Sequence, residues 1–188
     1  MTMQMIPTLV RKLNSMRIKG AIEPLVPTIN KAKELLNITV PDIMAFPYLA
    51  DYDGYVRVVD SRGIEITQGS PIMGYYYPGM PIMISRYDPQ TGRQLENPEL
   101  LLFILHELRH IYQYTYHHAE YYSHNAVGCE CLLDKAEIDA DAFAVAFMRV
   151  NTTYHPSTYM MWMLGLMIND GGRREQRVEQ IESQIVNK

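Results

Sequence analysis

The chain has 188 residues, of which 47% are hydrophobic and 20% charged, and these values are typical of a globular protein with its own core. The formal net charge of −4 implies no broad basic surface, although it leaves room for a local basic patch, so we expect no direct binding of nucleic acid. No run of about 18 apolar residues is present, and the first twenty residues lack a signal-peptide pattern. We therefore expect a cytoplasmic protein with no membrane segment and a single domain over residues 1–188.

The first half of the chain predicts a short helix and then a small sheet. Residues 1–27 are interpreted as an N-terminal extension, and residues 28–37 as a helix with Thr28 as its cap. Residues 38–86 hold short segments rich in β-branched and aromatic residues, separated by turn-forming pairs such as Asp-Gly and Pro-Gly. This pattern predicts a small, mostly antiparallel sheet, followed by a loop over residues 87–98.

The second half of the chain predicts helices. Asn97 followed by Pro98 is a typical helix start. The expected helices cover about residues 97–116, a segment from Glu130 or Asp134 to Arg149, residues 158–169 and residues 172–187. In the last of these, basic residues alternate with acidic ones, which is typical of a solvated helix face. Strands that precede helices in this way favour an α+β fold with helices on one face of the sheet, and residues 150–188 form C-terminal helices of unassigned role.

The sequence HELRH, at residues 106–110, places two imidazoles one helical turn apart. Positions i and i+4 lie on the same face of a helix, so His106 and His110 can direct ring nitrogens to one point. Glu107 is rotated by about 100° from His106, where it can reach a metal-bound water without becoming a ligand. This is the H-E-x-x-H arrangement, in which the histidines bind zinc and the glutamate acts as general base.

The alternative is that both histidines are hydrogen-bonded core residues. The apolar run LLFIL leads directly into His106 and predicts that this imidazole is buried. A buried imidazole beside a carboxylate is costly unless something compensates it, and a metal ion would do so. The context therefore favours a metal site.

A catalytic zinc site requires a third protein ligand. The segment AEIDADAFAVAFM contains Glu137 and Asp141, which share a helix face, together with alanines that allow another helix to approach closely. We expect Glu137 to bind the metal and Asp141 to accept a hydrogen bond from a ligand histidine. The second choice for the third metal ligand is Asp141 itself. The alternative is that Asp134 and Glu137 form a capping box and that Asp139 and Asp141 are solvated.

Together the two motifs resemble the ImmA/IrrE family of metallopeptidases, which pair H-E-x-x-H with a downstream helix of the type E-x-x-A-[ND]-x-F-A. The matching residues of the second motif are Glu137, Ala140, Asp141, Phe143 and Ala144. The resemblance covers roughly residues 28–148. It implies a zincin-like fold, in which a small sheet packs against the active-site helix, and a gluzincin-type site with Zn²⁺ on His106, His110 and Glu137. Family members usually carry glycine before the second histidine, where this chain has Arg109.

The resemblance implies a zinc-dependent metallo-endopeptidase, with Glu107 as base and a regulatory protein or peptide as substrate. One alternative is a catalytically degenerate zincin that serves a phage or mobile element as a binding module. The retention of Glu107 argues against this, since a binding module needs no base. Another alternative is a structural zinc site, which would have to recruit Cys129 or Cys131 as a further ligand.

Two further segments are candidates for parts of the site. Tyr154 and His155 follow the second long helix and could donate hydrogen bonds to a transition-state oxyanion. Residues 81–87, PIMISRY, could form an edge strand that pairs with an extended substrate, although an ordinary buried strand explains the same pattern.

Overall fold

The computed structural model describes residues 17–52, 55–59, 70–88, 90–121, 135–154 and 172–187. It is a mixed α+β structure, which confirms the predicted class. The chain divides into two compact units, one formed by residues 1–24 and 41–100 and the other by residues 25–40 and 101–188. Within the described residues, no helix combines the length and apolarity needed to cross a bilayer.

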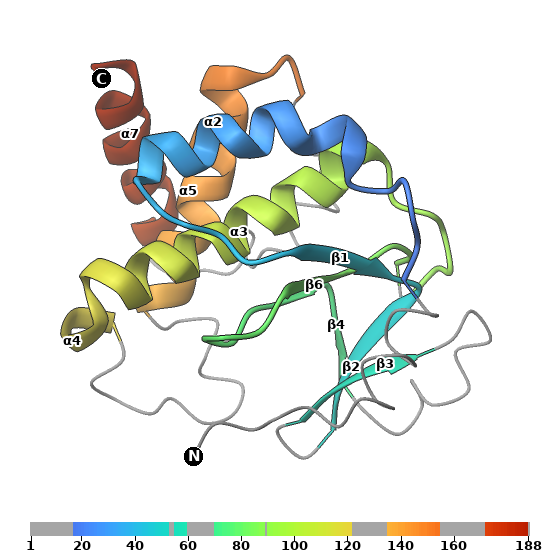
Figure 1. The fold of residues 1–188 in the computed structure, drawn as a ribbon. Coiled ribbons are helices and arrows are strands. Elements are labelled where there is room, and N and C mark those ends of the chain that lie inside the picture. The colour runs from blue at the N-terminus through green and yellow to red at the C-terminus, as the bar shows by residue number, and fades with distance from the viewer. Residues whose placement is uncertain are drawn as a thin grey trace. The chain divides into compact units, whose positions relative to one another are not determined.

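The first unit contains the strands. They are β1 (Ile43–Phe46), β2 (Tyr48–Tyr52), β3 (Tyr55–Val59), β4 (Ser70–Ile72), β5 (Gly74–Tyr75) and β6 (Ile82–Ser85) (Figure 1). The described strands form two three-stranded sheets, with the orders β1-β6-β5 and β3-β2-β4, where we expected one sheet. The pairing of β1 with β6 is parallel, and the other pairings between these strands are antiparallel, as the sequence pattern predicted.

The strand β6 lies in the middle of its sheet, with β1 on one side and β5 on the other. Both of its backbone edges are therefore paired, and the prediction that residues 81–87 form an edge strand able to bind substrate is wrong. The side chains of β6 are only 0–5% exposed, and this burial explains the apolar pattern of the segment. Ser85 links the two sheets, because its hydroxyl accepts a hydrogen bond from the Leu49 N–H (2.9 Å) and donates one to the Ile72 carbonyl (2.8 Å).

The helix α3 (Asn97–Tyr116) begins where the sequence predicted and continues from the first unit into the second. Its start is fixed by Glu99, whose carboxylate accepts hydrogen bonds from the backbone N–H of Glu96 (2.7 Å) and from the Arg93 guanidinium (2.6 and 3.0 Å). A carboxylate in the first turn also interacts favourably with the positive end of the helix dipole. The contacts of Glu99 with Arg93 and Glu96 therefore fix the residue at which the helix with the HELRH motif begins.

The second unit is helical. Besides most of α3, it contains α2 (Val26–Leu36), α4 (His118–Tyr121), α5 (Lys135–Asn151) and α7 (Arg173–Val186). The helix α2 begins two residues before the predicted start, after a 3-10 turn (Glu23–Leu25), so Thr28 lies inside the helix and is not its cap. Pro27 in the first turn explains the earlier start, because proline fits that position without loss of a hydrogen bond. The segment predicted as an extension, residues 1–27, thus includes part of this helix.

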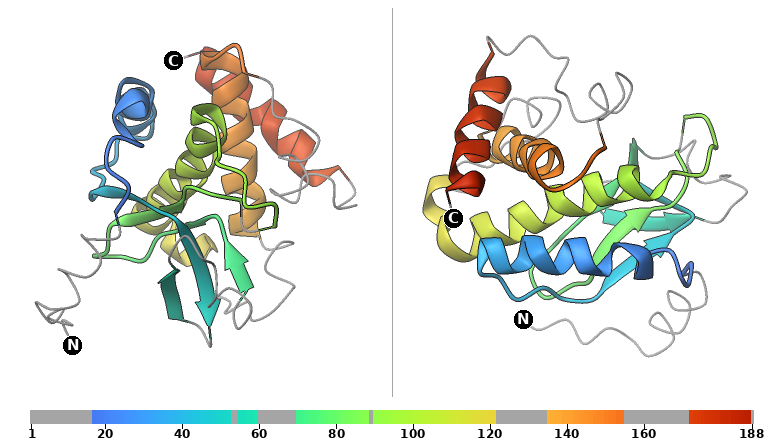
Figure 2. Two further views of the ribbon diagram at one scale, coloured as in Figure 1. Left: turned by 90° about the vertical axis from the view of Figure 1, so that its right-hand side faces the viewer. Right: turned by 90° about the horizontal axis from the view of Figure 1, so that it is seen from above.

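The helix α5 is buried almost all round. From Ala136 to Met148, every residue except Glu137 is buried, and the alanines of this stretch are 0–4% exposed. Small side chains let neighbouring helices come close, as the sequence predicted for a site shared between helices. The C-terminal helix α7 lies alongside α5 (Figure 2), with Val178 and Ile181 buried at 0% and 2%.

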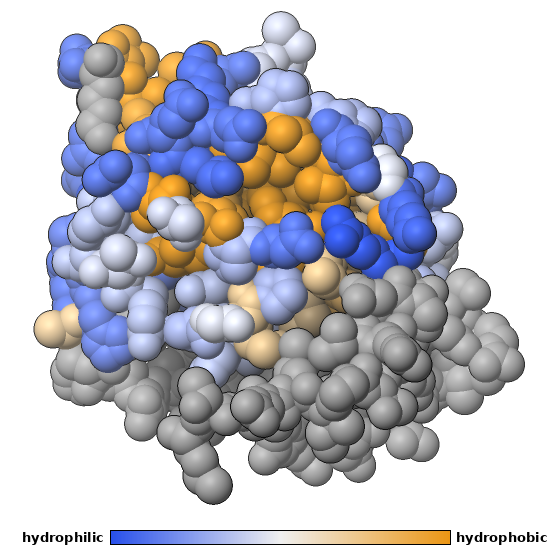
Figure 3. Space-filling model, in the orientation of Figure 1, coloured by the Kyte–Doolittle hydropathy of each residue, from blue (hydrophilic) through white to orange (hydrophobic). Residues whose placement is uncertain are grey.

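Some predicted features lie outside the described residues. These are the helix over residues 158–169, the capping residue Asp134, the cysteine pair Cys129 and Cys131, and His155. On the surface of the second unit, hydrophobic side chains gather over the helices and are bordered by hydrophilic ones (Figure 3).

Candidate metal centre

His106, His110 and Glu137 come together at the crossing of α3 and α5. The Nε2 atoms of His106 and His110 are 2.9 Å apart. Glu137 places Oε2 at 3.3 Å from the first of these nitrogens and Oε1 at 3.3 Å from the second. All three residues therefore offer a ligand atom to one point, and these atoms lie within 4.8 Å of one another.

The spacing of these atoms fits a metal ion. Two ligands bound at about 2.05 Å to a tetrahedral zinc lie about 3.3 Å apart, so the separations of 2.9 and 3.3 Å need to change by only a few tenths of an ångström. The side chains of both histidines are 14% exposed and that of Glu137 is 30% exposed. The point between them is thus accessible to an ion and to a further, non-protein ligand.

The tautomer of His106 follows from its partner Asp141. The His106 Nδ1 lies 2.9 Å from Asp141 Oδ1, and an ionised carboxylate can only accept hydrogen bonds. This network assigns the proton of the neutral ring to Nδ1, which leaves the Nε2 lone pair directed at the cluster. Asp141 therefore lies behind the His106 ring, where it accepts the hydrogen bond that the sequence predicted, and it is not among the three converging residues.

The tautomer of His110 follows from Gln113, which sequence reasoning missed. The Gln113 amide nitrogen donates to the Ala136 carbonyl (2.9 Å) and to Asp139 Oδ2 (2.8 Å), so its oxygen must be the atom at 2.8 Å from His110 Nδ1. His110 then donates from Nδ1, and its Nε2 also carries a lone pair. Gln113 lies one turn after His110 on the same face, which was the available signal in the sequence.

With both protons on Nδ1, two lone pairs and a carboxylate face one another. Such a group favours a positive centre, and the directions of the pKa shifts agree. Burial lowers the pKa of His106, but the hydrogen bonds to Asp141 and Glu137 outweigh burial and hold this pKa well above its ordinary value. For His110 burial again lowers the pKa, but the neighbouring Glu137 raises it more, so the net shift is upward.

Glu137 responds in the opposite direction. Burial raises the pKa of its carboxyl, but the His110 and His106 imidazoles outweigh burial and hold this pKa well below its ordinary value. Glu137 is therefore ionised at neutral pH, as a metal ligand must be.

Glu107 follows His106 on α3 and is 6% exposed. Its charge contributes to the raised pKa of His110, after the larger effects of burial and of Glu137. Glu107 precedes His110 by three residues, a spacing that places two side chains next to each other on a helix. The cluster of converging ligand atoms does not include Glu107. The role of Glu107 as general base stays a prediction.

The most unexpected feature behind the site is the partner of Arg109. Arg109 is 7% exposed and donates from Nε and Nη2 to the two oxygens of Asp139, at 2.6 and 3.0 Å. Its guanidinium also stacks over the Tyr112 ring, 4.4 Å from the centroid. Arg109 thus forms a buried ion pair between α3 and α5.

Asp139 and Asp141 are both 2% exposed, so the alternative that they are solvated is wrong. Burial raises the pKa of Asp139, but the Arg109 hydrogen bonds and charge, Gln113 and Arg177 outweigh it and lower this pKa from 3.8 to about 2. The signal available in the sequence was the presence of charged residues on a helix whose other positions are apolar.

The C-terminal helix α7 supplies two further guanidiniums. Arg174 Nε lies 3.1 Å from Asp141 Oδ2, and Arg177 donates from Nε and Nη2 to Asp139 Oδ1 at 2.7 and 2.6 Å. Arg174 is only 2% exposed. The prediction that the charges of this helix form a solvated face is therefore wrong for Arg174, because its partner is a buried carboxylate.

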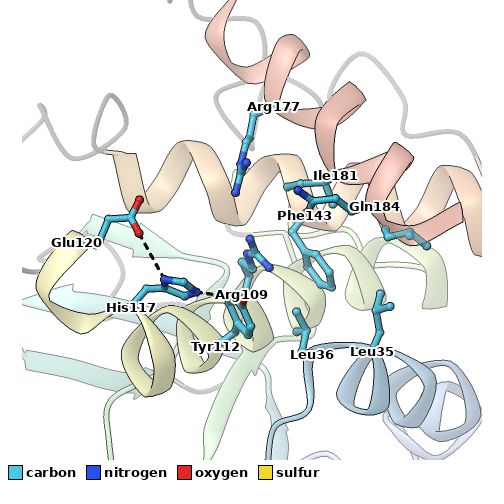
Figure 4. A pocket seen from close by; sticks show the side chains of 11 residues that line it. Leu35, Leu36, Arg109, Tyr112, His117, Glu120, Phe143, Arg177, Ile181 and Gln184 are labelled. Atoms are coloured by element: carbon cyan, nitrogen blue, oxygen red, sulfur yellow. Dashed lines mark hydrogen bonds and ion pairs between the residues drawn. The ribbon is translucent and has the colours of Figure 1, made fainter. Parts of the chain in front are cut away.

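A pocket of about 410 Å³ lies on the flank of this network (Figure 4). Arg109 from α3 and Arg177 from α7 point towards each other across it, and Leu36, Phe143 and Ile181 supply apolar walls. At its rim, His117 contacts Glu120 (3.4 Å) and Tyr112 (3.1 Å). The converging metal-site residues are not among those that line this pocket.

Tyr154, one of the two predicted oxyanion donors, lies just beyond the end of α5. Its backbone N–H donates to Thr152 Oγ1 at 3.2 Å. His155, the other candidate, falls outside the described residues. Their role at a transition state stays a prediction.

Comparisons of the chain with protein-family models, with curated proteins and with solved structures found no match. The site is therefore interpreted from its own geometry: His106, His110 and Glu137 form a cluster that could hold a metal ion.

Proposed function

We propose that this protein is a zinc-dependent metallo-endopeptidase with a zincin-like fold, related to the ImmA/IrrE family that its motifs resemble. The observation that carries the proposal is the convergence of two imidazole Nε2 lone pairs and one ionised carboxylate on a single point. A set of two nitrogens and one oxygen suits zinc, and three protein ligands leave one position open for water or substrate.

Zinc bound at such a site polarises a carbonyl group and lowers the pKa of a coordinated water. The residues of the chain supply the remaining steps. Glu107, next to His106 and close to His110, accepts the proton of the attacking water and then donates it to the leaving amine. Asp141 and Gln113 hold the two imidazoles in the tautomer that presents Nε2.

Metal content and cleavage can be tested separately. Wild-type protein purified without chelator should contain about one zinc per chain. A variant with His106→Ala and His110→Ala should contain none while keeping its helical far-UV circular dichroism. Absence of metal from the wild type under these conditions would contradict the proposal.

The activity test uses Glu107→Gln, which preserves the size of the side chain but removes the base. This variant should bind zinc as the wild type does and should cleave nothing. Peptide fragments that appear in a cell extract with wild type and not with Glu107→Gln would identify the substrate. If no such fragments appear although zinc is bound, the protein is a zincin-like binding module and not a peptidase.

A further inference from the structure

The C-terminal helix α7 takes no part in ligating the proposed metal, yet two of its side chains reach the carboxylates behind the ligands. Arg174 and Arg177 are three residues apart and so lie on the same side of the helix. Their side chains are 2% and 28% exposed. Each begins a series of contacts that ends at one of the two histidines.

The first series, which we call the Asp141 link, has one residue between the arginine and the histidine. Arg174 Nε contacts Asp141 Oδ2 at 3.1 Å, and Asp141 Oδ1 accepts the hydrogen bond from His106 Nδ1 at 2.9 Å. The two oxygens of one carboxylate thus serve the two partners separately. A rotation of Asp141 would break both contacts, so Arg174 helps to fix the orientation of the His106 ring.

The second series has one more member, and we call it the Asp139 link. Arg177 donates to Asp139 Oδ1 (2.7 and 2.6 Å), Asp139 Oδ2 accepts from the Gln113 amide (2.8 Å), and Gln113 accepts from His110 Nδ1 (2.8 Å). Arg109 also donates to both oxygens of Asp139. This link therefore retains one guanidinium when Arg177 is removed.

We propose that α7 is the support of the metal centre, and that Arg174 and Arg177 are positioning residues that orient His106 and His110 through Asp141 and Asp139. The inference rests on the proposed metal site. Buried carboxylates are costly without a counter-charge and would otherwise turn towards solvent. The guanidiniums on Asp139 and Asp141 hold these carboxylates in place. Hydrogen-bond partners of metal ligands, which Asp141 and Gln113 would be, typically contribute 10–100-fold to metal affinity, and the arginines act through them.

Other residues hold α7 against α5 away from the site. Val178 and Ile181 are buried, and Arg149 of α5 contacts Glu175 (3.2 Å) and Glu182 (3.3 Å) of α7. Docking of the helix can therefore be weakened without touching Asp139 or Asp141. Arg149→Gln is the matched control, since it also removes one guanidinium from the α5–α7 contact.

The experiment measures the affinity of the full chain for Zn²⁺ by competition with a chromophoric chelator, and the visible absorption of the Co²⁺-substituted protein. We expect the Arg174→Gln, Arg177→Gln double variant to bind Zn²⁺ 10–100-fold more weakly and to show an altered Co²⁺ spectrum. Arg174→Lys, which keeps the charge but not the Nε contact, should recover part of the affinity. Arg149→Gln should match the wild type in both measurements.

The double variant is used only if circular dichroism and cooperative unfolding show that it folds. If it does not fold, the Arg177→Gln single variant tests the proposal, because Arg109 still pairs with Asp139 and keeps this variant folded. A smaller loss of affinity, about 3- to 10-fold, is then expected. Wild-type affinity and spectrum in the arginine variants would overturn the proposal and leave the metal centre intact. An equal loss in Arg149→Gln would also overturn it, because general docking of α7 would then explain the effect. Failure of the wild type to bind metal would instead refute the proposed function.

Discussion

The two histidines of the site are supported in different ways, although they lie one turn apart on the same helix. His106 donates to a carboxylate, Asp141, which contacts one guanidinium from α7. His110 donates to an amide, Gln113, and the carboxylate behind it, Asp139, accepts hydrogen bonds from two arginines. A carboxylate on the ring makes the imidazole a more basic ligand, whereas a neutral amide mainly fixes its orientation.

This difference suggests a division of roles. Besides orienting the two rings, the Asp141 link acts on the electronic character of His106, and the Asp139 link adds to the cohesion of α3, α5 and α7. Arg109 fits the second role. It joins α3 to α5 through Asp139.

The largest expected effect is on stability. Asp139→Asn should lower the free energy of unfolding of the metal-free protein by about 3–5 kcal/mol, because it leaves two guanidiniums without their carboxylate. Urea unfolding followed by circular dichroism measures the change. As a control, Asp42→Asn removes an exposed partner of Arg17 and should cost less than about 1 kcal/mol. An equal effect of the two substitutions would show that the Asp139 link does not hold the helices together.

The next effect is on metal affinity. Asp141→Asn should weaken zinc binding about 10–100-fold, because the amide removes the negative charge behind His106. Its effect on the stability of the metal-free protein should be smaller than that of Asp139→Asn, because Asp141 contacts one arginine where Asp139 contacts two. Competition with a chelator and urea unfolding measure the two quantities. If Asp139→Asn reduced zinc affinity more than Asp141→Asn does, the proposed division of roles would be wrong.

Acid should destabilise the protein through the Asp139 link. The pKa of Asp139 is lowered in the folded state to about 2 from 3.8. A depressed carboxyl pKa stabilises the fold above the unfolded pKa, and this contribution disappears as the pH falls through the folded pKa. It amounts to about 2 kcal/mol, present above about pH 4 and lost towards pH 2. The difference in unfolding free energy between wild type and Asp139→Asn, measured in metal-free protein, should therefore shrink over this range. A difference that stays constant from pH 5 to 2 would contradict the prediction.

The smallest effect is expected at Gln113. Gln113→Leu removes the acceptor of His110 without changing any charge, so zinc affinity should fall by about tenfold, at the lower end of the range for hydrogen-bond partners of metal ligands. The same chelator competition measures it. Glu120→Gln, at an exposed side chain in contact with His117 and Lys135, is a control that should leave the affinity unchanged. A loss as large as that of Asp141→Asn would show that the amide matters as much as the carboxylate.

More of the candidate site than of the sheet arrangement could be predicted from the sequence. His106, His110, Glu137 and Asp141 share helical spacings, and helix geometry converts such spacings into common faces with little help from the rest of the chain. Strand pairing has no comparable local rule. Residues 82–85 form a buried strand as their pattern indicated, but the central position of β6 depends on β1 and β5, which are distant in sequence or short.

The sequence by itself determined the mixed α+β class, the bounds of α3, the amphipathic α7 and the three residues that converge as a candidate metal cluster. Tertiary structure alone decided the partners behind that cluster. Nothing in the local sequence distinguishes a solvated arginine from one that meets a buried carboxylate on another helix, because both satisfy the same helical pattern. Only the packing of α7 against α5 brings Arg174 to Asp141 and Arg177 to Asp139, and the low polarity of that interior requires these charges to be paired.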